Sequence, residues 1–480
     1  MIRSLKFSLI LLIVSVSQLD TGYAQSASLP NVIFIMADDL GYGDIGAYGQ
    51  KLIRTPNIDA LAKAGIKFTQ FYAGTSVCAP SRSSLMTGQH TGHTPIRGNK
   101  EAIPEGQFPL KGSAYTIAEL FKNAGYVTGD FGKWGLGFVG TEGDPNNQGF
   151  DHFFGYNCQR LAHDYYPDHL WDNSTRVDLP NSLTKSEVYA PDMIQARALE
   201  FIEANKRKPF FAFMSFTLPH AGLELPENDK LFLEYRKIFN ESPKVVKAIK
   251  TEPSLYKGQP YPHSAYAAMV TRLDDYVGQL VAKLKNLGIE KNTLIIFTSD
   301  NGPHVEGGND PQFFNSSGGF RGVKRDLYEG GIRGPMIMSW PSVIESGRVS
   351  DHIGAFWDFM PTFADITNQR KPQNIDGISI LPALKGKGKQ QKHEYLYWEF
   401  HENGGRQAVR MGKWKGVKLN AKTNFDSPIE LFDLQKDPAE STDIAALNPE
   451  VVRKIKEIMK DARVENSDYP FTSQTNSPLK

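Results

Sequence analysis

Short apolar runs that end in acidic residues are the feature that most constrains the fold of this chain. "NVIFIMADDLG" begins at Asn31 and "NTLIIFTSDNG" at Asn292, and neither alternates apolar with polar residues as a half-exposed strand would. Helical patterns lie between such runs, as in "TPNIDALAKAGIKF", where Ile58, Leu61 and Ala62 share one face. Continuous apolar strands that alternate with helices predict an α/β fold, with a large, mostly parallel sheet sandwiched by helices.

The C-terminal part of the chain has a different pattern. A polar, Lys- and Gly-rich connector, "LKGKGKQQKHE", precedes three strand-like segments, "EYLYWEF", "QAVRMGKWKGVKL" and "PIELFDLQKDP". A last helix, "PEVVRKIKEIMKDARV", repeats apolar residues at helical spacing. We therefore expect a main domain over residues 25–385 and a smaller antiparallel sheet with one packed helix over residues 386–480.

The N-terminus has the features of a signal peptide over residues 1–24. Arg3 and Lys6 precede an apolar run from Phe7 to Val16, and small residues follow near Ala24. That run is shorter than the roughly 20 apolar residues of a membrane span, and no later segment approaches this length. No cysteine lies near the expected cleavage site, so we expect no lipid anchor. The sequence predicts an exported protein, periplasmic or secreted.

Charge and cysteine content argue against several classes of protein. The formal net charge of +1 argues against a broad surface for nucleic acid or anionic membrane. Two cysteines in 480 residues cannot form a disulfide framework, and a chain of this length can bury a large core without one. An anionic ligand must therefore be bound by a local cluster of cations.

Two pairs of oxygen donors follow the two apolar runs. Asp38 and Asp39 end the first, and Asp300 and Asn301 end the second. In a parallel sheet these four side chains would meet at one edge, where hard oxygen donors suit Ca²⁺ or Mg²⁺. Either pair alone is also typical of a turn, since Asp and Asn are common where strands end.

The segment "SVCAPSRSSLMTG" places Cys78 just before a predicted helix start at "SSLMTG". Pro80 fits a first helical turn, whose free backbone N–H groups attract anions, and Arg82 adds a fixed positive charge. The Cys-x-x-x-Arg spacing differs from that of cysteine-dependent phosphatases. The alternative is that Cys78 is only a small buried residue at a helix start.

Several motifs together resemble one enzyme family. "CAPSR" with "SSLMTG" resembles the maturation motif of type I sulfatases, in which the cysteine is oxidised to formylglycine (3-oxoalanine). "VIFIMADDLGYGD", "GKWGLG", "FTSDNGP" and "YEGGIRGPMIMSWP" occur in the order of arylsulfatase-like members of the alkaline phosphatase superfamily. The resemblance runs strongly from Pro30 to Pro341 and implies an alkaline phosphatase-like fold and hydrolysis of sulfate esters.

The resemblance also implies roles for individual residues. Asp38, Asp39, Asp300 and Asn301 would bind calcium, or magnesium, together with the modified Cys78, which would be the nucleophile. Arg82 would orient that nucleophile, Lys133 and Lys324 would neutralise sulfate oxygens, and His220 would protonate the leaving alcohol. A maturation enzyme that generates formylglycine is the implied protein partner, and a sulfated sugar or aryl sulfate is the implied substrate.

In the implied reaction, one hydroxyl of the hydrated aldehyde attacks sulfur and forms a covalent sulfate ester, and the second hydroxyl then expels sulfate. Many relatives carry a histidine two residues after the lysine of "GKW", but this chain has Gly135. His163 is the replacement that we predict first, although a histidine in a loop is as often structural. His304, just past the "DNG" turn, is a second candidate and an expected substrate contact.

Three alternatives remain open from the sequence. One is a phosphodiesterase or phosphonate hydrolase of the same superfamily, and another is an inactive glycan-binding relative, which Gly135 alone favours. The third is a structural protein in which a disulfide joins Cys78 to Cys158.

A loop of the C-terminal domain is the expected rim of the substrate pocket. The segment "YWEFHENGGRQAVR" has aromatic and polar side chains that suit a sugar; these are Trp398, Glu399, His401 and Arg406. An ordinary hairpin with an "NGG" turn is the alternative. The sequence identifies neither the sugar nor the position of its sulfate.

Overall fold

The computed structural model describes residues 29–182, 184–245, 258–424 and 426–470. The expected signal peptide, residues 1–24, lies outside the described residues. Within the described ranges, none of the helices combines the length and the apolar character that crossing a bilayer requires.

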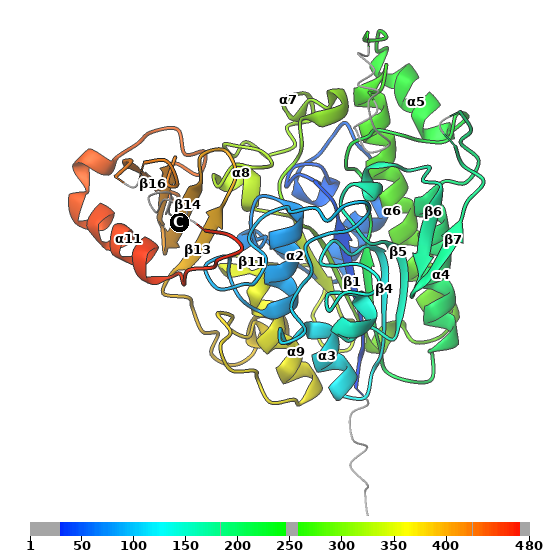
Figure 1. The fold of residues 1–480 in the computed structure, drawn as a ribbon, viewed down its shortest axis with the longest axis horizontal. Coiled ribbons are helices and arrows are strands. Elements are labelled where there is room, and N and C mark those ends of the chain that lie inside the picture. The colour runs from blue at the N-terminus through cyan, green and yellow to red at the C-terminus, as the bar shows by residue number, and fades with distance from the viewer. Residues whose placement is uncertain (1–28, 183, 246–257, 425, 471–480) are drawn as a thin grey trace, which may run out of the picture.

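Ten strands form the large sheet of the described chain (Figure 1). The central strands β9, β1, β8, β4 and β5 run parallel, β10 is antiparallel to its neighbours β9 and β2, and β6 and β7 form an antiparallel edge. The expected large, mostly parallel sheet is therefore confirmed. Across the sheet the order is β11 (Arg348–Ser350), β2 (Ile66–Phe68), β10 (Met336–Ser339), β9 (Thr293–Ser299), β1 (Asn31–Ala37), β8 (Phe210–Ser215), β4 (Val127–Lys133), β5 (His152–Tyr156), β6 (His169–Asp172) and β7 (Thr175–Asp178).

Helices cover both faces of this sheet because its central strands are apolar on both sides. In β1, Ile33 and Ile35 pack into one core and Val32 and Phe34 into the other. The first core includes α1 (Pro56–Ala64), α4 (Ala190–Ala204), α5 (Lys230–Phe239), α6 (Pro262–Asn286) and α7 (Pro311–Phe314). The second includes α2 (Cys78–Thr87), α3 (Ile117–Asn123), α9 (Phe359–Thr367) and α10 (Leu381–Lys385).

A smaller antiparallel sheet lies beside the large one, at the left of Figure 1. Its strands follow chain order: β13 (Leu396–Phe400), β14 (Arg406–Met411), β15 (Trp414–Leu419) and β16 (Ile429–Asp433). Helix α11 (Pro449–Asp461) packs Ile455 and Met459 on one face. The other face packs against residues that include Tyr72 and Trp357, near β3 (Phe71–Tyr72), β12 (Gly354–Ala355) and α8 (Glu329–Ile332). The expected antiparallel sheet with one packed helix is confirmed.

The carboxyl ends of four adjacent parallel strands meet at one edge of the large sheet. Asp38 follows β1, Asp300 follows β9, Lys133 ends β4, and the loop after β8 carries His220. Ligand sites of open α/β sheets form at such edges, because loops diverge there and leave room for a ligand.

Candidate active site

The polar residues that follow β1 and β9 lie against one another. The Asp39 backbone N–H donates to Asp300 Oδ1 at 3.2 Å, and Asn301 Nδ2 donates to Asp39 Oδ1 at 2.7 Å. Asp38, Asp39, Asp300 and Asn301 are all fully buried. The structure thus brings together the four oxygen-donor residues that the sequence singled out.

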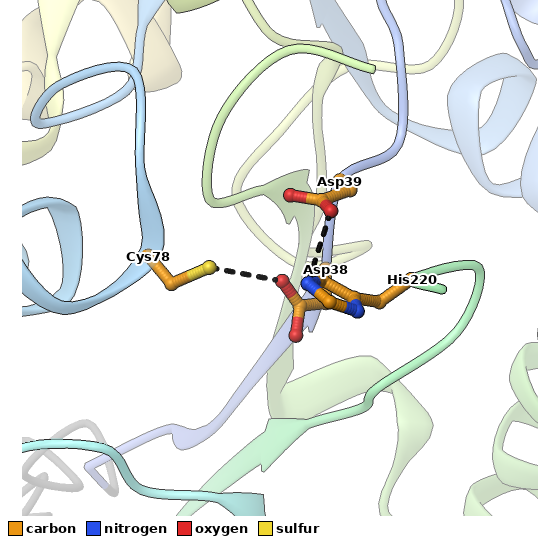
Figure 2. A group of neighbouring side chains, drawn as sticks. All are labelled: Asp38, Asp39, Cys78 and His220. Atoms are coloured by element: carbon orange, nitrogen blue, oxygen red, sulfur yellow. Dashed lines mark hydrogen bonds and ion pairs between the residues drawn. The ribbon is translucent and has the colours of Figure 1, made fainter. Parts of the chain in front are cut away.

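This donor set fits a hard divalent cation. Asn301 Oδ1 has no hydrogen-bond partner among the described residues, although burying an unpaired oxygen is costly. Figure 2 shows Asp38, Asp39, Cys78 and His220 grouped together, with one ligand atom of each lying within 4.8 Å of the others. Several carboxylate and amide oxygens close together are the ligands that Ca²⁺ and Mg²⁺ prefer.

Each carboxylate of the cluster also has a buried cation. Lys133 Nζ lies 2.5 Å from Asp38 Oδ2, Lys324 Nζ lies 2.7 Å from Asp39 Oδ2, and Arg82 Nη2 lies 3.0 Å from Asp300 Oδ2. Burial would raise the pKa of Asp38, but Lys133 and other nearby cationic groups hold it well below its usual range. Burial and the Asp38 charge raise the pKa of Asp300 to about 7. Arg82 also donates to the Lys133 carbonyl, so its guanidinium links the end of β4 to Asp300, which follows β9.

Cys78 is the first residue of α2, so the helix begins five residues before the "SSLMTG" start expected from sequence. Its Sγ donates to Asp38 Oδ1 at 3.4 Å, as Figure 2 shows, and its side chain is 2% exposed. Burial and the Asp38 charge raise the pKa of the thiol. An unmodified Cys78 would therefore be a protonated thiol, which is a poor nucleophile.

His220 and Lys324 form a hydrogen-bonded pair above Asp39. Lys324 Nζ lies 3.0 Å from His220 Nε2, which itself lies 3.2 Å from Asp39 Oδ2. His220 Nδ1 donates to the Ala221 carbonyl, which leaves Nε2 facing the lysine. Burial and the Lys324 charge hold the pKa of His220 well below its usual value. With its proton on Nδ1, neutral His220 accepts a hydrogen bond at Nε2 from the Lys324 ammonium.

Both candidate replacements for the absent histidine lie near His220. The ring of His163, from the short 3₁₀ helix Leu161–His163, stacks on His220 with centroids 4.5 Å apart and planes 4° apart. The His304 ring centroid lies 5.8 Å from that of His220, and its Nε2 is 3.0 Å from the Pro219 carbonyl. Long-range folding, rather than any sequence motif, creates this group of three histidines.

The expected sugar-binding residues of the C-terminal sheet have other partners. Trp398 lies fully inside the core between the sheets, and its indole N–H donates to the Ala73 carbonyl at 3.1 Å. Glu399 is also fully buried and is engaged by two arginines, a histidine and a tyrosine. These contacts correct the expectation that Trp398 and Glu399 grip a sugar, because neither has a free surface with which to do so. His401 and Arg406 are only half-buried.

Both cysteines are free. Cys158 is buried after β5, where its Sγ accepts from the Leu161 N–H at 3.4 Å. The alternative of a disulfide between Cys78 and Cys158 is therefore wrong.

A buried ion cluster between the two sheets was missed by sequence reasoning. Glu329, on α8, accepts from the Tyr72 hydroxyl at 2.6 Å and pairs with Lys415 at 2.9 Å. Its own N–H donates to Glu440 Oε2 at 2.6 Å. The only sequence signal was the "YEGG" motif, whose Glu329 lies five residues after Lys324. Because Lys415 lies on β15 and Glu440 follows β16, this cluster joins the smaller sheet to the loop that carries Lys324.

A second group of potential metal ligands, away from this cluster, is satisfied internally. His90 Nδ1 accepts from the Gly92 N–H at 3.1 Å, so His90 Nε2 carries its proton, 3.6 Å from Asp376 Oδ1. His93 Nδ1 lies 2.9 Å from the same carboxylate. Asp376 also accepts from the His90 backbone N–H at 2.9 Å, so its carboxylate is engaged by the two histidines themselves.

Comparisons with known proteins agree with this geometry. A family model described as Sulfatase matches residues 30–369, and one described as N-sulphoglucosamine sulphohydrolase, C-terminal, matches residues 319–465. Arylsulfatase A from Bos taurus is 31% identical, covering 90% of this chain and 87% of the relative. N-acetylgalactosamine-6-sulfatase from Rattus norvegicus is 31% identical, covering 74% of this chain and 66% of the relative. A crystal structure of Ps i-CgsB in complex with k-i-k-neocarrahexaose superposes with a TM-score of 0.74 at 29% identity, covering 91% of this chain and 93% of the other.

Proposed function

Because this chain belongs to the sulfatase family and is a sulfuric ester hydrolase, we propose that it removes sulfate from a sulfated carbohydrate. The nucleophile in this proposal is formylglycine made from Cys78, and the metal is calcium, with magnesium as the other candidate. A relative named for N-acetylgalactosamine 6-sulfate and a structural neighbour solved with a carrahexaose support the carbohydrate substrate. The signal-peptide features of residues 1–24 support action in the periplasm or outside the cell.

The observation that carries the proposal is the single buried cluster at the carboxyl edge of the sheet. Cys78 Sγ lies 3.4 Å from Asp38, whose other oxygen contacts Lys133. Four oxygen-donor residues would hold the metal, which when bound would stabilise negative charge on the sulfate oxygens: Asp38, Asp39, Asp300 and Asn301. Hydrated formylglycine at position 78 would supply one hydroxyl to attack sulfur and a second to allow release of sulfate.

The remaining residues bind the ester and move protons. Lys133 and Lys324 carry ammonium groups into the cluster, where they would contact sulfate oxygens whose charge grows in the transition state. His220 Nε2 would deliver to the leaving alcohol a proton that it takes from the Lys324 ammonium, its hydrogen-bond partner. His163 stacks on His220 and is the base that we propose for releasing sulfate.

The proposal is tested by comparing enzyme produced with and without a formylglycine-generating maturation enzyme. Mass spectrometry of the peptide with "SVCAPSR" should show an aldehyde or its hydrate at position 78, whereas Cys158 should keep its thiol as an internal control. Sulfate release should rise in proportion to conversion. A preparation with unmodified Cys78 that is equally active per molecule would contradict the proposed nucleophile.

The substrate class is tested with matched esters. The converted enzyme should hydrolyse at least one of N-acetylgalactosamine 6-sulfate, galactose 6-sulfate and glucosamine 6-sulfate, together with 4-nitrophenyl sulfate. The corresponding phosphate esters should be hydrolysed more slowly. Faster hydrolysis of the phosphate esters would overturn the assignment in favour of a phosphohydrolase.

A further inference from the structure

Gln159 carries a buried amide that the protein leaves unpaired. Its side chain is 5% exposed, and neither Nε2 nor Oε1 has a hydrogen bond to any residue within the described part of the chain. Its backbone N–H donates to Gln107 Oε1 at 3.2 Å, so the loop itself is held in place. Leaving a buried polar atom unpaired destabilises a protein. Two such atoms on one side chain indicate that a ligand completes their hydrogen bonds.

The amide lies beside Gly135, two residues after Lys133. A Cβ atom added to Gly135 would lie 2.1 Å from Gln159 Nε2, so the amide fills the space in which a side chain of residue 135 would begin. Gly135 follows the end of β4, two residues after Lys133, and its φ of 73° takes the chain out of the extended conformation. Trp134 points elsewhere, because its indole N–H donates to the Gly143 carbonyl at 2.8 Å. The amide therefore lies against the backbone two residues beyond Lys133, whose Nζ contacts Asp38.

The loop that carries Gln159 continues to the leaving-group side of the cluster. Four residues further on, His163 stacks on His220, the histidine that we propose as the proton donor to the leaving alcohol. The Gln159 amide thus adjoins the backbone just after the lysine expected to contact sulfate, and its loop leads to His163, the stacking partner of the proposed proton donor.

The chemistry of an amide limits what it can bind here. A sulfate oxygen only accepts hydrogen bonds, so it would pair with Nε2 and leave Oε1 unpaired. A sugar hydroxyl both donates and accepts, and can satisfy both ends. An unsubstituted aryl group offers neither a hydrogen-bond donor nor an acceptor. An amide also cannot take up a proton, so Gln159 is not a base.

We propose that Gln159 hydrogen-bonds a sugar hydroxyl next to the scissile sulfate ester and thereby selects carbohydrate sulfates over aryl sulfates. This inference rests on the proposed function. A site built to pair a hydroxyl discriminates against a substrate that lacks one, because the site's own buried groups are then left unpaired.

The test compares the converted wild type with Gln159→Leu, which keeps a similar volume without hydrogen-bonding atoms. For the sulfated monosaccharide that the wild type hydrolyses fastest, kcat/KM should fall about 10- to 100-fold, the loss expected for one or two buried hydrogen bonds. For 4-nitrophenyl sulfate it should change by less than about 3-fold, which also shows that the variant folds. Gln195→Leu is the matched control, because Gln195 is a buried glutamine on α4, and it should leave the ratio of the two substrates unchanged.

A binding measurement separates recognition from chemistry. The sulfate-free monosaccharide should inhibit 4-nitrophenyl sulfate hydrolysis competitively, with an inhibition constant about 10-fold weaker or more in Gln159→Leu, whereas inorganic sulfate should inhibit both proteins equally. Equal losses on both ester substrates, or no loss on either, would overturn the inference. If the converted wild type hydrolysed no sulfate ester at all, the proposed function would fail first, so the two failures are distinguishable.

Discussion

Replacing Glu399 by glutamine is expected to destabilise the protein rather than to weaken substrate binding. Glu399 lies on β13, and its Oε1 accepts from Arg97 at 3.0 Å and from His401 at 2.9 Å. Its Oε2 accepts from Arg463 at 3.0 Å and from the Tyr397 hydroxyl at 2.8 Å. Arg97 precedes β4 of the large sheet, whereas Glu399 lies on β13 of the smaller sheet and Arg463 follows α11, so this carboxylate joins the two parts.

The pKa of Glu399 gives the size of its contribution to the free energy of unfolding. Burial alone would raise this pKa, but the hydrogen bond and charge of His401 and the charges of Arg97 and Arg463 lower it from 4.5 to about 2. At about 1.4 kcal/mol for each pKa unit, the ionised carboxylate contributes about 3 kcal/mol to the free energy of unfolding at neutral pH. Removing one partner of a buried ion pair typically lowers the free energy of unfolding by about 3–5 kcal/mol, which agrees with this value.

The stabilisation by Glu399 depends on pH in a definite direction. Because the pKa is lower in the folded state, the stabilisation is fully present above about pH 4.5 and is lost as the pH falls toward 2. Urea unfolding of the wild type and of Glu399→Gln should therefore differ by about 3 kcal/mol at pH 7 and by progressively less toward about pH 3.

The matched control is Glu457→Gln on α11. Glu457 is exposed and lies 3.6 Å from Arg453, so its loss should cost less than about 1 kcal/mol. The reasoning would be refuted if Glu399→Gln were as stable as the wild type and instead raised KM for a sulfated monosaccharide more than about tenfold. That result would return Glu399 to the substrate-binding role expected from sequence.

Other predictions concern the catalytic cluster. A chelator should abolish sulfate release and added Ca²⁺ should restore it, while Asp300→Asn should lose metal, measured by atomic emission, and activity together; full turnover by this variant would remove Asp300 from the metal site. Alanine at Lys133 or Lys324 should lower kcat more strongly than it raises KM, and an effect on KM alone would indicate a uniform binding contact. His220→Ala should slow hydrolysis of sugar sulfates more than that of 4-nitrophenyl sulfate, whose phenolate leaves without a proton; equal losses would argue against its acid role. His163→Ala should release one equivalent of alcohol rapidly and then stall, and unchanged steady-state turnover would exclude it as the base.

The sequence by itself determined the architecture and the positions of the oxygen donors. Continuous apolar strands such as Val32–Met36 require cover on both faces, which helices between the strands supply. Parallel strands then bring their carboxyl ends to one edge, so Asp38 and Asp300 had to meet although 262 positions separate them in the numbering. Local pattern and sheet geometry were sufficient for this inference.

The tertiary structure alone decided the surroundings of that edge. His163 meets His220, Gln159 fills the space over Gly135, and Glu399 pairs inside a core instead of facing a sugar. None of these contacts follows from periodicity, because loops have no repeating face and β13, which carries Glu399, is buried on both faces. The direction of such side chains is set by packing and ion pairing with residues distant in the chain, and these residues meet only in the folded protein.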